Sequence, residues 1–217
     1  VTMEGERVIN LLHDVIAAKG YEKYTMFRHF ANIIGAYPRL EGTVHVNVGL
    51  VLKFMPNYML NPAEYPEIGT RLDAVDDKFF FAQGPTRGAG RVQFADWKPA
   101  FERFSRIDNV ATFYGQARKF ADFLMTAGPD AEQQKDLDFL LTVGQIFSLI
   151  AYGQLILEQA ELTGLDDDAV AQIFDTIIRD FSSFAVDLLG KPTATVPQQD
   201  WARDAIAAPT PDPERFD

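Results

Sequence analysis

The sequence contains no cysteine, and its cationic side chains are outnumbered by acidic ones. The absence of thiols excludes disulfides, thiolate catalysis and thiolate metal sites. Lys and Arg number 20 against 31 Asp and Glu. The basic residues form no cluster that would bind a phosphate backbone, so we expect no nucleic acid partner. The histidines, His13, His29 and His45, come without an evident third metal ligand, so no metal site is predicted.

Targeting segments are a second absence. Residues 1–6 have neither the basic region nor the apolar region of a signal peptide, so we expect none. This absence and the lack of cysteine together favour a cytoplasmic protein. The stretch from Phe139 to Leu157 carries no charge and has the length of a membrane span. It also contains Gln145 and Gln154, and acidic residues flank both ends, so we expect a buried central helix, with membrane contact as the alternative.

Helical periodicity is what the sequence does contain, whereas a strand signal is negligible. The chain is 47% hydrophobic with 18 Phe, which is enough to build a core. Short loops marked by Gly, Pro and Asp join the periodic segments, a pattern typical of antiparallel neighbours. We therefore predict an all-α chain built as one or more antiparallel helical bundles. The expected helices cover residues 5–19, 25–35, 44–55, 67–78, 97–105, 107–127, 130–163 and 167–189.

Changes in composition along the chain predict its domain organisation. Residues 1–58 form a helical segment, and residues 59–95, which Pro and Gly punctuate, form an irregular linker. Residues 96–190 form a helical bundle. Residues 191–217 form a proline-rich tail that wraps the surface or is loose.

One group of motifs resembles a known family. Gly20-Tyr21 is followed by the helical stretch Met26–Phe30 and then by Leu40-Glu41-Gly42-Thr43. This arrangement resembles the C-terminal helical segment of acyl-CoA dehydrogenases, in which a Gly-rich turn ending in Gly-Tyr, a helix and a Tyr-Glu-Gly-Thr motif follow at closely this spacing. The resemblance covers about residues 8–55. The helices from residue 97 onward resemble an additional helical domain that some longer members carry.

The resemblance implies a catalytic role for Glu41 and contacts between FAD and Gly20, Gly42 and Thr43. A thioester α-proton is weakly acidic, so its removal needs a base in a dry pocket. By resemblance Glu41 would be that base, and the β-hydride would leave to the flavin. The implied substrate is an acyl-CoA or an acyl-carrier thioester.

The sequence departs from the family pattern at three places. Ala17-Ala18 stand where the family has a Gly-Gly pair, Leu40 stands where it has Tyr, and Asn32-Ile33 fall near a common Arg-Asp pair. The family's N-terminal helical domain and middle β-domain are also absent from this sequence, so the resemblance implies a partner chain or domain that carries them, in an oligomer. The alternative is a non-catalytic helical interaction or oligomerisation subunit that has lost the flavin site.

Overall fold

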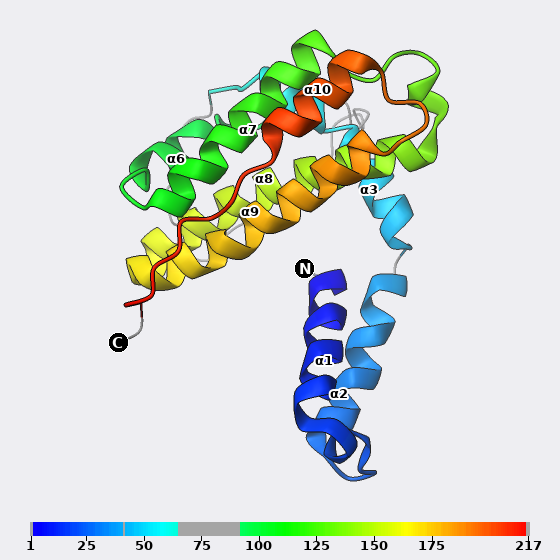
Figure 1. Ribbon diagram of the computed structural model, residues 1–217, viewed down its shortest axis with the longest axis vertical. Coiled ribbons are helices and arrows are strands. Elements are labelled where there is room, and N and C mark those ends of the chain that lie inside the picture. Colours follow the sequence, from blue (N-terminus) through cyan, green and yellow to red (C-terminus); the bar gives the residue numbers. More distant parts are fainter. Residues whose placement is uncertain (1, 41, 65–91, 216–217) are drawn as a thin grey trace, which may run out of the picture. The chain divides into compact units, whose positions relative to one another are not determined.

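The computed structural model describes residues 2–40, 42–64 and 92–215, and every regular element within these ranges is a helix (Figure 1). The all-α prediction is therefore confirmed for the described part of the chain. The helix expected over residues 67–78 lies outside the described residues.

The chain divides into two compact units, residues 1–49 (unit 1) and residues 50–217 (unit 2). The boundary between the two units falls within helix α3 (Val44–Leu52). The four segments expected from composition stay a prediction.

Unit 1 is built on a helical hairpin. Helix α1 (Thr2–Ile16) is followed by a 3₁₀ turn, η1 (Ala17–Tyr21), and by α2 (Met26–Ala36), a second 3₁₀ turn η2 (Tyr37–Arg39) and the start of α3. The space above Gly5 is filled by Ile34, and the ring of His13 meets the ring of Phe27 at 4.5 Å. The later residue of α1, His13, therefore contacts the earlier residue of α2, Phe27, so the two helices run antiparallel.

Both ends of the turn between α1 and α2 have a local cause. Helix α1 ends at Ile16, three residues before the expected end, because Ala17 has a φ of 51° and so leaves the right-handed helical region. Helix α2 begins after Thr25, whose hydroxyl caps it by accepting a hydrogen bond from the Arg28 N–H at 3.4 Å.

Unit 2 begins with a short helix that the sequence reasoning missed. The helix expected to stop at Pro56 ends instead at Leu52, and α4 (Met55–Leu60) follows with Pro56 in its first turn. Proline is tolerated there because the first N–H groups of a helix have no intrahelical acceptor.

The remaining helices of unit 2 enclose an aromatic core. Helices α7 and α9 pack against each other, α8 packs against α9, and α10 packs against both α7 and α9 (Figure 1). Fully buried phenylalanine rings join the helices, including Phe101, Phe113, Phe174 and Phe181. The elements are α6 (Lys98–Arg103), α7 (Asp108–Thr126), η4 (Gln133–Lys135), α8 (Leu137–Thr163), α9 (Asp167–Leu189) and α10 (Val196–Ala205).

Helix α8 contains the long uncharged stretch. Among the described helices it alone is long and apolar enough to cross a membrane, judged by length and composition. In the structure 44% of its most apolar window is buried, and Phe139, Val143, Ile150 and Leu157 belong to the core of unit 2. The structure is thus compatible with a soluble protein in which α8 is a core helix.

The proline-rich tail is more ordered than its composition indicates. Thr195 and Gln198 form a capping box that starts α10, with Pro197 in the first turn. Ala202 and Ala205 of this helix are fully buried in the core. Residues 191–205 are therefore part of the fold of unit 2.

Candidate functional site

The structure places the predicted site residues of unit 1 at the two ends of α2. Gly20 lies in η1, before α2, and Gly42 and Thr43 lie between η2 and α3, after it. The 11 residues of α2 alone span about 16 Å at about 1.5 Å per residue. Glu41, the predicted base, lies outside the described residues. Only an elongated ligand that runs along α2 would touch both ends.

Gly20 is buried, and its environment has a packing explanation. A Cβ atom at this position would lie 2.6 Å from Nδ1 of His13, which is closer than Cβ atoms approach other non-bonded atoms in proteins. The His13 ring is also held by Tyr21, at 4.8 Å between ring centroids. The missing side chain at Gly20 therefore makes room for His13 inside the turn, and not for a ligand.

Gly42 has a conformational explanation. Its φ of 98° lies in the left-handed region, where an L-residue with a side chain is strained. The carbonyl of Thr43 accepts a hydrogen bond from the Asn47 N–H at 3.1 Å, which begins α3. Gly42 and Thr43 thus form a tight entry into α3, directly after the position of Glu41.

Ala17 shares this unusual backbone. It is the one non-glycine residue with positive φ in the described part of the chain. It also occupies the first position of the pair that is Gly-Gly in the family that the sequence resembles. The backbone at position 17 has the conformation that a glycine favours, although the residue is alanine.

Unit 1 also carries an apolar surface that the site residues do not explain. Val8, Leu11 and Val15 are exposed on α1, with 47%, 53% and 79% of their surface accessible. Their spacing places them on one line along α1. This line is rotated by about 100° around the helix axis from the line through Gly5 and His13, which faces α2. A helix with two apolar lines about 100° apart is typical of a bundle in which it packs against two neighbours.

Helix α2 repeats the pattern. Phe27 and Ile34 mark the side of α2 that faces α1. The exposed side chains of Phe30, Ile33 and Tyr37 lie on a second line, rotated by about 100° around the helix axis. As on α1, the rotation is toward the residue that precedes in the sequence. Because α1 and α2 are antiparallel, equal rotations in the same sense bring the two exposed lines to the same side of the hairpin. We call this side the apolar hairpin face, and its members are Val8, Leu11, Val15, Met26, Phe30, Ile33 and Tyr37.

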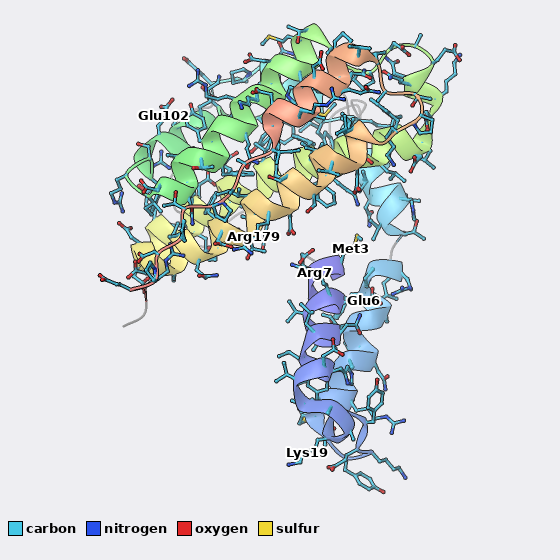
Figure 2. The ribbon with its side chains drawn as sticks, in the orientation of Figure 1. Met3, Glu6, Arg7, Lys19, Glu102 and Arg179 are labelled. Carbon is cyan, nitrogen blue, oxygen red and sulfur yellow. The ribbon has the colours of Figure 1, made fainter. Side chains whose placement is uncertain are left out.

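Polar contacts fasten the hairpin at the end opposite to the Gly20 turn. The guanidinium of Arg39 donates to the Glu6 carboxylate at 3.2 Å and also to the carbonyl of Gly35. Figure 2 shows Met3, Glu6 and Arg7 at this end of the hairpin and Lys19 at the turn. The apolar hairpin face lies between these two polar ends, which defines its length along the helices. Helical periodicity in the sequence already contains the signal of two apolar lines.

Unit 2 has a separate apolar cavity of about 320 Å³ between α4 and α8. Its polar wall is a chain in which the Tyr58 hydroxyl donates to the Gln154 side-chain carbonyl, and the Gln154 amide donates to Glu158 at 2.7 Å. Burial and the nearby Glu158 carboxylate raise the pKa of Tyr58, so the phenol stays protonated. The sequence reasoning named none of these side chains as site residues, because their partners are distant in the sequence.

The residues of unit 1 fit a flavin only in part. A Cβ at Gly42 would make ordinary contacts with Val46 and Asn47, at 3.5 and 3.6 Å, whereas the space at Gly20 is filled by His13. The described residues of unit 1 provide an apolar wall and a glycine-type loop. The remaining walls of a flavin site would come from other polypeptide.

Comparisons of the chain with protein-family models, with curated proteins and with solved structures gave no match.

Proposed function

We propose that this chain is the C-terminal helical portion or subunit of a flavin-dependent acyl-CoA or acyl-carrier dehydrogenase, with Glu41 as the base that removes the thioester α-proton. The main support for the proposal is that the backbone has positive φ at two positions where the resembled motif has glycine. Ala17 and Gly42, with φ of 51° and 98°, stand where the resembled family has glycine. Two such positions at the two ends of α2 support a shared backbone, since left-handed φ is rare away from glycine.

In this proposal FAD is the cofactor and accepts the β-hydride. The protein's part is to hold Glu41 away from water next to the thioester, because a desolvated carboxylate is a stronger base than a hydrated one. Gly42 would let flat ring systems approach the backbone without a Cβ in the way. The active oligomer would be cytoplasmic.

The apolar hairpin face supports the need for a partner. A face of this kind, exposed in the described structure, costs free energy in water until another apolar surface covers it. The matching surface is a pair of helices from the chain or domain that carries the flavin-binding part. Its two apolar lines favour a helical partner over an irregular one.

The catalytic test uses the chain co-expressed with a candidate partner that carries the missing flavin-binding domains. The assembled protein should show flavin absorbance and should reduce an artificial electron acceptor with acyl-CoA. Glu41→Gln should abolish turnover while flavin absorbance stays, because the base is lost and the fold is kept. Glu22→Gln, a change at an exposed acid of the same unit, is the matched control. Full turnover in Glu41→Gln would exclude Glu41 as the base.

The second candidate is a non-catalytic helical interaction subunit. The surroundings of Gly20 favour this candidate, because the packing of His13 explains why position 20 is a glycine without any cofactor. This candidate predicts a colourless protein that associates through the apolar hairpin face whether or not Glu41 is present.

Association is tested separately from catalysis. Leu11→Asp together with Phe30→Asp should prevent assembly, because each places a charge on the buried side of the interface. The control is Asn10→Asp together with Asn32→Asp, which adds the same charge on exposed positions away from this face. Light scattering and flavin absorbance then separate the two candidates. Assembly without flavin supports the interaction subunit, and assembly with flavin supports the dehydrogenase.

A further inference from the structure

The apolar cavity of about 320 Å³ between α4 and α8 has an inner wall that belongs to the core of unit 2. Its most buried lining side chains are Tyr58 of α4 and Phe147 of α8, which are 7% and 2% exposed. The two rings meet edge to face, with 5.2 Å between their centroids. Packed rings of this kind keep their positions, so the inner wall of the cavity is preformed.

The segment that precedes α6 supplies a second wall. The ring of Phe94 lies edge to face with that of Tyr58, at 5.5 Å, and with that of Phe54, at 5.8 Å. The carbonyl of Phe94 accepts a hydrogen bond from the Ala63 N–H at 2.8 Å, which ties this wall to the residues that follow α4. The cavity is therefore bounded by aromatic rings from three separate segments of the chain.

The polar groups of the inner wall are engaged within the protein. The Tyr58 hydroxyl donates to the side-chain carbonyl of Gln154, and the Gln154 amide donates to Glu158 at 2.7 Å. Burial raises the pKa of Tyr58, so its hydroxyl keeps the proton that it donates. A water molecule needs two to four polar partners to be held well, and this wall offers few, so an apolar ligand would displace water easily.

The same wall disfavours charged ligands. An anion would lose its hydration and would lie near the carboxylate of Glu158, which stands behind Gln154. A cation would also lose its hydration, and the Gln154 amide lies between it and Glu158. At the mouth of the cavity, Leu155 is 61% exposed, so a ligand has an apolar way in.

We propose that this cavity binds a small uncharged aromatic molecule, which packs against the rings of Tyr58, Phe94 and Phe147. The volume lies at the lower end of the range of about 300–1,000 Å³ that is typical of small-molecule sites. It is about twice that of an apolar cavity of roughly 150 Å³ that binds benzene in another protein. The site lies within unit 2 and does not depend on Glu41 or on a flavin.

The test is a titration of the full chain at constant ionic strength, followed by NMR of its backbone amides. The probes are benzyl alcohol, benzoate and benzylammonium, which each contain one benzene ring and differ in charge. Benzyl alcohol should shift the amide signals of α4 and of the middle of α8 in a saturable way, and the two ions should bind at least tenfold more weakly. No saturable shift with benzyl alcohol, or equal affinity for either ion, would overturn the proposal.

Two variants with matched controls locate the site. Ala151→Leu places a larger side chain in the cavity and should weaken benzyl alcohol at least tenfold, whereas Ala111→Leu, at an exposed alanine of α7, should leave binding unchanged. Leu155→Glu changes an exposed residue at the mouth, which the fold tolerates, and should weaken binding several-fold. Its control is Leu162→Glu, at a residue of α8 that is 83% exposed and lies outside the cavity. Undiminished binding in both Ala151→Leu and Leu155→Glu would assign the shifts to another place and sink the proposal.

Discussion

Unit 1 and unit 2 are both helical, but they bury their side chains in different ways. In unit 1 the only described residues that are buried are Gly20 and Pro38. Unit 2 has a continuous core in which large aromatic rings are fully enclosed. Helix formation alone thus does not make a stable unit, because most of the free energy comes from packing an apolar face. Unit 2 meets this criterion, whereas unit 1 leaves the side chains of the apolar hairpin face exposed.

The sharpest test of this contrast replaces one apolar side chain in each unit. Phe113 is fully buried, and its ring lies 5.6 Å from that of Phe174 and 5.8 Å from that of Phe181. Phe113→Ala should lower the free energy of unfolding of unit 2 by about 3–5 kcal/mol, because it leaves a cavity. Leu11→Ala, at a residue that is 53% exposed, should change stability by less than about 0.5 kcal/mol.

Urea denaturation followed by circular dichroism measures both changes. Equal losses in the two variants would mean that Leu11 is covered in the isolated chain, and the contrast between the units would then be wrong.

A smaller effect concerns the buried amides that attach α10 to the rest of unit 2. Gln133 and Gln198 donate to each other's side-chain carbonyls at 2.8 Å in both directions. Gln198→Leu should cost about 1–3 kcal/mol, because the partner amide is left buried without its bonds. Gln134→Leu, at the exposed neighbour, is the control and should be nearly neutral.

Thermal unfolding is the measurement for this pair. A Gln198→Leu variant as stable as Gln134→Leu would mean that α10 contributes little to unit 2, as expected for a loose tail.

Glycines provide the next comparison, because two of them sit in helix interiors of unit 2 with different surroundings. A Cβ on Gly153 of α8 would meet Phe113 at 3.0 Å and Phe101 at 3.3 Å, whereas a Cβ on Gly115 of α7 would meet nothing within 4 Å. Gly153→Val should destabilise by about 1–3 kcal/mol through overpacking. Gly115→Ala should stabilise by up to about 1 kcal/mol through helix propensity.

The midpoints of urea unfolding distinguish the two substitutions. Stabilisation by Gly153→Val would contradict the close packing of α8 on the aromatic rings.

The sequence predicted long helices with local signals well. Helix α9 runs over residues 167–189 as expected, and Asp166 caps it. The capping box of α10 is also present in the sequence as Thr195 and Gln198, but the prediction for the tail followed its prolines and did not use the box. Local hydrogen bonds of this kind leave a pattern in four consecutive residues, so they are readable without a structure.

Other features needed the structure. Helix α8 was expected from residue 130, but it begins at Leu137, because the Asp136 carboxylate caps it by accepting from the Phe139 N–H. Hydrogen bonds from Thr193 and Phe139 to this carboxylate lower the pKa of Asp136. Before it, the Asp130 carboxylate holds a turn by accepting from the Gln133 N–H. The hydrogen bond from Tyr58 to Gln154 was likewise invisible, since it joins α4 to α8 through residues far apart in the sequence. The role assigned to Glu41 stays a prediction.

The smallest expected effect lies in unit 1 and tests whether its turn is strained. Ala17 has a φ of 51°, a region that costs an L-residue roughly 1–2 kcal/mol but costs glycine little. Glycine also gains freedom in the unfolded chain, worth about 0.4–1 kcal/mol, so Ala17→Gly should stabilise unit 1 by about 1 kcal/mol. Ala18→Gly is the matched control, because Ala18 is not among the residues with positive φ, and it should destabilise. Amide hydrogen exchange across α1 and α2 should therefore slow in Ala17→Gly and quicken in Ala18→Gly. Faster exchange in both would mean that position 17 gains nothing from glycine, and one of the two backbone positions that support the dehydrogenase proposal would be lost.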